Sequence, residues 1–503
     1  MRVLILLVAW STVLAWVGTA QASDQRKNII FVLVDDLRFD ALGFLRPELD
    51  TPFIDEIAEN GVYFPNASVT SSLCSPSRAT ILTGQTMRNH RIVDNYSSSE
   101  EGLVFFPSYL QETGYETSFF GKWHMGQDDD DPRPGFDHWV SFRGQGTYQP
   151  VVNGRKQTLN VNGERVERET YITDELTDYA IEWLAAGRDP TKPFFLYLSH
   201  KAVHSELAPA SRHVGQYEKV AIDLPQSASG TNGQDSNKPM WVQNQKNSWH
   251  GVDFPYHKAI LIEDWVRLYY ETLSSVDDSL GRIISYLREN DLEDDTFIVF
   301  FSDNGFLHGE HGLIDKRNAY EPSIRVPLIA YAPSMLPGGV TVDARVRNLD
   351  LAPTFLEVAG IAPPPQFEGK SFLSAAQSTR DSSEWLQDFV YEYYWEWNFP
   401  HTPTTFAIVR DNFKFIQYHG VWDIEELYDL ERDPDEMVNL AYDERYADKK
   451  ATLQDALWQS LANSEGQHTV DYKNRQGQTH VLRSAEGSRS ASFPPRWIVT
   501  EGD

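Results

Sequence analysis

The sequence predicts an α/β fold in which a large, mostly parallel sheet is sandwiched by helices and is followed by a smaller C-terminal α+β subdomain. Apolar runs of strand length alternate with amphipathic segments through residues 28–301, as in parallel sheets with helical crossovers. A serine-rich stretch at 371–383 interrupts this pattern. Short aromatic strands and one helix are expected after it, at 390–394, 405–410, 413–417, 426–429 and 445–461.

The predicted elements of the large unit follow a strand-then-helix order. Residues 28–34 are continuously apolar, which indicates a strand buried on both faces. Pro52 in a first turn and Gly61 at the end delimit a helix. The alternation continues with strands at 117–120, 194–198 and 296–301 and helices at 172–186 and 265–284.

Polar or ionisable side chains directly follow four of these strands. Ligands bind beyond the carboxyl ends of the strands in such sheets, so we expect the four groups to meet at one rim. They are Asp35 and Asp36, Lys122 and His124, His200 and His204, and Asp303 and Asn304. This rim is the predicted functional site.

Four segments are predicted along the chain. Residues 1–22 combine a positive start, an apolar run and an Ala-Gln-Ala end, which are typical of a secretory signal peptide. Residues 23–375 are assigned to the N-terminal catalytic α/β domain, 384–483 to the C-terminal subdomain and 484–503 to a tail. No stable membrane insertion is expected, because the apolar run is shorter than the roughly 20 residues of a spanning helix.

The composition excludes several classes of function. The formal net charge of −29 argues against nucleic acid, which requires a basic surface. Cys74 is the only cysteine, so an intramolecular disulfide and a cysteine-based zinc site are both excluded. A secreted chain without disulfides fits a bacterial periplasm or exterior better than an animal extracellular space.

The most specific motif is Cys74-Ser75-Pro76-Ser77-Arg78, followed by Ala-Thr-Ile-Leu-Thr-Gly at 79–84. Pro76 suits the opening turn of a helix, so Cys74 is expected at a helix N-terminus, where free N–H groups favour negative charge. A lone cysteine is more often a buried and inert residue. The neighbours of Cys74 favour a functional role.

The C-x-P-S-R box with A-T-x-L-T-G resembles the signature of the formylglycine-dependent type I sulfatases, which have an alkaline phosphatase-like fold. Other parts of residues 28–440 are similar to that family in order and spacing, namely Asp35-Asp36, Gly121–Gly126, Pro193–His204, Ser302–Gly305 and Lys316. The resemblance implies that a formylglycine-generating, sulfatase-maturating enzyme oxidises Cys74 to Cα-formylglycine (3-oxoalanine). That aldehyde hydrates to a geminal diol.

The resemblance also implies a metal ion and a set of catalytic side chains. Oxygen donors form the ligand set of a hard cation, and the family implies Ca²⁺ held by Asp35, Asp36, residue 74, Asp303 and Asn304. Arg78, Lys122 and Lys316 would hold the diol and the sulfate through positive charge. His204 would protonate the leaving alcohol, and His124 would assist the elimination of sulfate.

Several other residues have a functional and a structural interpretation. His200 is either near the site or a structural histidine, and His308 with His311 either contacts substrate or packs in a loop. The acidic run 128–131 is more typical of a solvated loop than of a second metal site. The aromatic cluster 391–397 is either a sugar-stacking wall or a packed edge strand, and 247–254 is the expected specificity insert.

The sequence therefore predicts a secreted or periplasmic sulfatase that hydrolyses O-sulfate esters of a sulfated carbohydrate. The algal polymer ulvan, fucan-like polymers and glycosaminoglycans remain open as substrates. One alternative is a phosphomonoester or phosphonate hydrolase of the same superfamily, because tetrahedral phosphate fits a similar cradle. The other is a glycan-binding protein in which Cys74 stays unconverted.

Overall fold

A computed structural model describes most of the chain. The described residues are 26–97, 102–126, 128–229, 237–245, 248, 250–252, 260–378, 385, 388–396, 398–419 and 424–462. The predicted signal peptide at 1–22 and the predicted tail at 484–503 lie outside them, so both stay predictions. Among the described residues, no helix has the length and apolar character needed to cross a membrane.

The main sheet has ten strands in the order β12-β2-β11-β10-β1-β9-β3-β4-β7-β8. The five central strands run parallel, whereas β11, β7 and β8 pair antiparallel. The strands are β1 (Asn28–Val34), β2 (Val62–Tyr63), β3 (Glu116–Lys122), β4 (His138–Phe142), β7 (Thr158–Val161), β8 (Glu164–Glu167), β9 (Phe194–Ser199), β10 (Thr296–Ser302), β11 (Leu328–Tyr331) and β12 (Val340–Thr341). The sheet is thus mostly parallel, as predicted, with antiparallel flanks.

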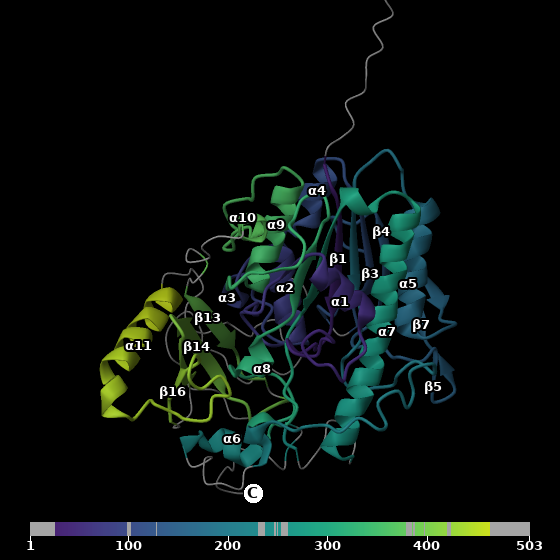
Figure 1. The fold of residues 1–503 in the computed structure, drawn as a ribbon. Helices are drawn as coiled ribbons and strands as arrows, with labels where there is room; N and C mark the ends of the chain where they lie inside the picture. The colour runs from purple at the N-terminus through teal and green to yellow at the C-terminus, as the bar shows by residue number, and fades with distance from the viewer. Residues whose placement is uncertain are drawn as a thin grey trace, which may run out of the picture.

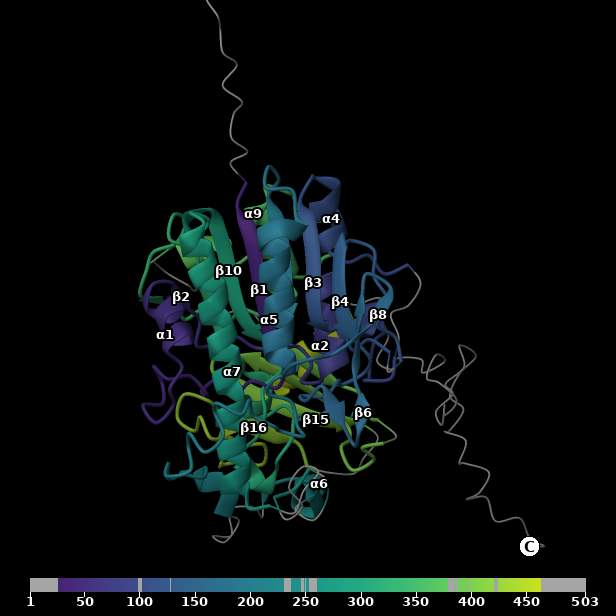
Figure 2. The same cartoon turned by 90° about the vertical axis from the view of Figure 1, so that its right-hand side faces the viewer.

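Helices cover both faces of the sheet, as Figures 1 and 2 show. One face carries α1 (Pro52–Glu59), α5 (Ile172–Glu182), which continues as a π-helical turn, and α7 (Ile262–Glu289). The other carries α2 (Cys74–Thr83), α4 (Pro107–Glu112), α9 (Leu351–Val358) and α10 (Leu373–Gln377). Alternate side chains of β1 enter the two cores, with Ile30 on the first face and Phe31 on the second. This explains why its sequence is apolar throughout.

The C-terminal part forms a separate antiparallel sheet in the order β13-β14-β15-β16. Its elements are β13 (Phe389–Tyr393), β14 (Thr404–Arg410), β15 (Phe413–His419), β16 (Glu426–Asp429) and α11 (Ala447–Ala462). Leu453 and Leu457 of α11 pack against Phe406 and Ile408 of β14. The predicted α+β character is confirmed, while the boundaries at 375 and 384 stay predictions. The remaining short elements are α3 (Met87–His90), α6 (Met240–Asn244), α8 (Glu321–Ile324), β5 (Val151–Val152) and β6 (Arg155–Lys156).

A buried histidine makes the stability of this fold depend on pH. The N–H of Ile92 donates to Nδ1 of His90 over 3.1 Å, and Nε2 lies 3.0 Å from Thr80 Oγ1. Burial lowers the pKa of His90 to about 3. The folded protein therefore keeps this imidazole neutral. Its contribution to the free energy of unfolding is fully present above about pH 6.5, which is the pKa of a histidine in the unfolded chain.

We expect the free energy of unfolding to fall as the pH drops from about 6.5 towards 3, by about 1.4 kcal/mol per pH unit for this group. In this window the unfolded chain gains a proton that folded His90 does not. Denaturant titrations at several pH values measure the slope for the wild type and for His90→Gln, in which the other histidines are unchanged. A variant with the same slope would contradict the assignment.

Candidate active site

The polar strand ends converge at one rim, as predicted, with the exception of His200, which points to α7. Strand β1 pairs with β10 in the register Val34 with Ser302, and with β9 in the register Leu33 with Ser199. Strand β3 joins the other edge of β9, with Gly121 opposite Ser199. The side chains that follow these strands therefore lie at one level.

Gly121 allows β3 to approach β9 closely next to the rim. Its φ of +121° suits glycine, and an added Cβ would lie 1.8 Å from the carbonyl oxygen of Ser199. Any larger residue would push the end of β3 outward. This local requirement positions Lys122, which follows at the end of the strand.

Cys74 begins helix α2 and is completely buried. Its Sγ lies 3.0 Å from Nζ of Lys316 and 3.5 Å from Oδ1 of Asp35. Burial raises the pKa of the thiol to about 12, despite the nearby charges of Lys122 and Lys316. At neutral pH the side chain is therefore a thiol rather than a nucleophilic thiolate.

Three carboxylates meet next to Cys74. Asp35, Asp36 and Asp303 each place an oxygen within 4.8 Å of the others. Burial favours the neutral form of Asp35, yet the charges of Lys122 and Arg78 hold its pKa well below the usual range. Burial and the charge of Asp35 raise the pKa of Asp303 to about 7. The cluster concentrates negative charge that a cation would neutralise.

The described contacts support a hard cation at this cluster. Asp36 Oδ2 and Asn304 Oδ1 are buried oxygens without a hydrogen-bond partner among the described residues. Asn304 instead donates through Nδ2 to Asp36 Oδ1 over 2.7 Å, which leaves its oxygen free. Carboxylate and amide oxygens are the donors that Ca²⁺ and Mg²⁺ prefer. The side chains present therefore fit the predicted metal.

Three cations surround Cys74 and the carboxylates. Lys122 contacts Asp35, and Lys316 contacts Asp36 as well as Cys74. Arg78 donates through Nε to Asp303 over 2.9 Å and through Nη1 to the carbonyl of Lys122 over 2.7 Å. The three cations form a buried cationic cradle next to the first turn of α2, and each of them is paired with a carboxylate of the cluster.

The two predicted catalytic histidines are also buried in this rim. His124 has a left-handed φ of 58°, and its Nε2 has no hydrogen-bond partner among the described residues. His204 Nε2 lies 3.9 Å from Asp36 Oδ2. Burial and the charge of Lys122 lower the pKa of both imidazoles well below the usual value. All the residues to which the resemblance assigned a catalytic or metal-binding role are thus brought together.

The structure adds three residues that the sequence interpretation did not select. Ser199 accepts from Arg78 Nη1 over 2.6 Å. Buried Lys201 places Nζ 4.6 Å from the ring of Tyr148, whose hydroxyl donates to the carbonyl of His204 over 2.7 Å. Ser199 and Lys201 flank His200 in the sequence, so their position at the end of β9 was the signal that could have identified them. Nothing local pointed to Tyr148.

The structure favours the structural interpretation for several of the open residues. His200 points to α7, where its Nε2 lies 3.1 Å from Ser279 Oγ. Tyr391, Tyr393 and Tyr394 are fully buried, as expected of core packing rather than of a sugar-stacking wall. Trp397 and much of the predicted insert at 247–254 lie outside the described residues.

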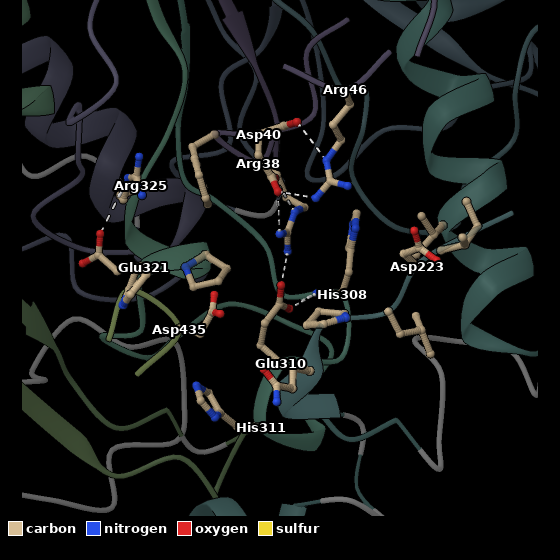
Figure 3. Close-up of a pocket in the computed structure, with 18 of the residues that line it drawn as sticks. Arg38, Asp40, Arg46, Asp223, His308, Glu310, His311, Glu321, Arg325 and Asp435 are labelled. Atoms are coloured by element: carbon tan, nitrogen blue, oxygen red, sulfur yellow. Dashed lines mark hydrogen bonds and ion pairs between the residues drawn. The ribbon is translucent and has the colours of Figure 1, made fainter. Parts of the chain in front are cut away.

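Two of the open groups remain, namely the acidic run at 128–131 and the pair His308 and His311. Asp130 and Asp129 of the acidic run pair with Arg165 and Arg133, as in a loop, although Asp130 is buried rather than solvated as predicted. His308 and His311 line a cavity of about 390 Å³ beside the loop at 304–315. Figure 3 shows this cavity.

A positively charged cradle next to an oxygen-donor site, on an alkaline phosphatase-like α/β sheet, defines a hydrolase that cleaves esters of tetrahedral oxyanions. Comparison with known proteins narrows this class. The chain belongs to the sulfatase family, whose model matches residues 27–361. Residues 309–463 match the C-terminal model of N-sulphoglucosamine sulphohydrolase. The predicted family, fold class and sulfuric ester hydrolase activity are confirmed.

Individual relatives cover most of the chain. An N-acetylglucosamine-6-O-sulfatase of Bacteroides thetaiotaomicron is 31% identical over 86% of this chain and 86% of its own length. A solved structure with its substrate D-glucosamine-2-N,6-O-disulfate has a TM-score of 0.77 and 30% identity, covering 87% of this chain and 98% of that one. A phosphonate monoester hydrolase from Silicibacter pomeroyi has a TM-score of 0.71 at 23% identity, covering 93% and 100%; this last similarity concerns the fold.

Proposed function

We propose that this chain is a secreted sulfatase that removes O-sulfate from a sulfated amino sugar, through a formylglycine made from Cys74 and with one Ca²⁺ ion. The observation that carries the proposal is the position of Cys74 between Lys316 and the carboxylate cluster. The relatives favour a glucosamine carrying a 6-O-sulfate over an algal polymer such as ulvan. Secretion is supported by the predicted signal peptide at 1–22.

The state of Cys74 supports its conversion by a maturating enzyme. A buried thiol with a pKa near 12 is a poor nucleophile at neutral pH. Formylglycine would supply a hydrated aldehyde with two hydroxyl groups on one carbon, one to displace the sugar oxygen from sulfur and the other to allow the sulfate to be expelled as the aldehyde re-forms. The position of residue 74 at the start of α2, with Arg78 one turn later, supports a role for such a group beside the cationic cradle.

The other side chains of the rim have separate roles in sulfate binding and proton transfer. Lys122, Lys316 and Arg78 provide fixed positive charge for the sulfate oxygens, which binds the ester and stabilises its transition state. His204 would hold the proton for the leaving sugar oxygen at Nε2. The negative charge of a bound sulfate ester raises the pKa of this imidazole and so favours its protonated form. His124, whose Nε2 has no hydrogen-bond partner within the described part of the chain, would accept a proton during release of sulfate.

Asp35, Asp36, Asp303 and Asn304 would hold the Ca²⁺ ion, with residue 74 beside it. When bound, the ion polarises the sulfate and favours ionisation of the attacking hydroxyl. We expect Asp303→Ala to lose both bound calcium and activity, because one of few charged ligands is removed. Elemental analysis after dialysis measures the metal content.

The matched control for this substitution is Asp277→Asn. Asp277 is a buried carboxylate that accepts N–H bonds from Phe53 and Ile54, away from the rim. This control should retain its calcium. A full complement of calcium in Asp303→Ala would contradict the ligand assignment.

A panel of defined esters tests the reaction and the substrate class together. It contains N-acetylglucosamine 6-O-sulfate, glucosamine-2-N,6-O-disulfate, sulfated ulvan oligosaccharides, an aryl sulfate and a phosphonate monoester. We expect the highest kcat/KM on a 6-O-sulfated glucosamine, measured by the release of sulfate from the sulfate esters and of the alcohol from the phosphonate. Faster hydrolysis of the phosphonate would favour the alternative hydrolase, and binding without turnover by unconverted protein would favour a glycan-binding role.

A further inference from the structure

The two loops that carry the metal-site oxygens are joined by a buried ion pair outside the reaction centre. One loop follows β1 and contains Asp35 and Asp36, and the other follows β10 and contains Asp303 and Asn304. Carboxylates held this close repel one another, and Lys122, Lys316 and Arg78 offset this repulsion by pairing with them. Asn304 also donates to Asp36 across the two loops. Further contacts between the loops add to these in keeping the oxygens in place.

Arg38 makes these contacts from the first loop. It is 4% exposed, and its Nη1 donates to the carbonyl of Phe306 and to Oε1 of Glu310, both over 2.9 Å. Nε and Nη2 also hold Asp40 in a bidentate pair, at 2.8 and 3.1 Å. Figure 3 shows this guanidinium between the carboxylates of Asp40 and Glu310. One side chain thus connects both loops by charged hydrogen bonds.

Glu310 and the backbone of Arg38 are held in place by further hydrogen bonds. Glu310 accepts the N–H of His308 through Oε2 over 2.6 Å, so it also fixes the turn of its own loop. The N–H of Arg38 donates to the hydroxyl of Tyr269, and that hydroxyl donates to the carbonyl of Asp36 over 2.7 Å. Asp36 has a left-handed φ of 62°, an uncommon conformation for aspartate that its surroundings must maintain.

We propose that Arg38 and Glu310 act as a positioning pair, which holds the loops after β1 and β10 in the arrangement that binds Ca²⁺. The proposal rests on the proposed function, because it assumes the metal site described above. Neither side chain is one of the proposed ligands, and both line the 390 Å³ cavity on the side of the 304–315 loop shown in Figure 3. Residues that orient metal ligands typically alter metal affinity when they are replaced.

The test replaces the pair and measures Ca²⁺ binding directly. The variants are Arg38→Met and the double variant Arg38→Met with Glu310→Leu, which leaves no unpaired buried charge at Glu310. Asp40 keeps its contact with Arg46 in both. We expect the Ca²⁺ affinity of chelator-treated protein, measured by calorimetry, to fall by about 10- to 100-fold.

A matched pair elsewhere separates positioning from a general loss of stability. Arg168 and Glu175 form a similarly buried ion pair, with Nε 3.0 Å from Oε2, that connects β8 and α5. The double variant Arg168→Met with Glu175→Leu should change Tm without weakening Ca²⁺ binding. If the Arg38 and Glu310 double variant binds Ca²⁺ as tightly as the wild type, the proposal is wrong. If the wild type itself binds no Ca²⁺, the proposed metal function falls, and this inference falls with it.

Discussion

Cys74→Ala is expected to lose sulfatase turnover by a factor on the order of 10⁴ or more, because the side chain that carries the proposed nucleophile is removed. The fold should remain, with a loss of stability of about 1 kcal/mol, which is ordinary for a single substitution. The reason is local, since the cysteine begins α2 and contributes little to either core cluster of the main sheet. Released sulfate and a thermal unfolding curve measure the two effects.

Two further variants make this result specific. Cys74→Ser should bind substrate and turn over poorly, because a serine ester lacks the second hydroxyl that expels sulfate. Ser77→Ala is the matched control, since Ser77 is buried in the same helix and accepts from Asn348 at 2.9 Å. The mass of the peptide that contains residue 74 reports conversion in each protein. Substantial turnover by Cys74→Ala would rule out the covalent mechanism.

The rim could be predicted because its signals are local. Continuous apolar strands followed at once by Asp35, Lys122 or Asp303 identify the carboxyl ends of a parallel sheet, and those ends must share an edge. The Cys74 motif is equally compact. The positions of β1, β9 and β10 were therefore predicted within a residue or two from composition and order.

The rest depends on pairings between distant parts of the chain. Strand β11 runs antiparallel to β10, and its four residues carry no signal of direction. The pairing of Arg38 with Glu310 spans 272 residues and could not be anticipated from either residue alone. Lys201 is a similar case, because a lysine after a strand is usually solvated, whereas here it is buried against Tyr148.

His204→Ala is expected to impair sugar sulfates far more than an activated aryl sulfate. A sugar alkoxide needs a proton as it leaves, whereas a phenolate with a low pKa leaves unaided, and general acid catalysis typically contributes about 10²- to 10⁴-fold. Nε2 of His204 lies 3.9 Å from Asp36 Oδ2, at the edge of the carboxylate cluster. The ratio of kcat/KM values on the two substrates measures this role, independently of any change in the amount of folded enzyme.

Two other histidines serve as controls for that ratio. His124→Ala should impair both substrates equally, since release of sulfate is common to them, and His200→Ala should leave the ratio unchanged because His200 contacts Ser279. Equal losses on both substrates for His204→Ala would show that His204 binds substrate rather than donating the proton. The donor would then be sought at Lys201, where burial lowers the pKa to about 8, because an ammonium group of that acidity can still protonate an alkoxide at neutral pH.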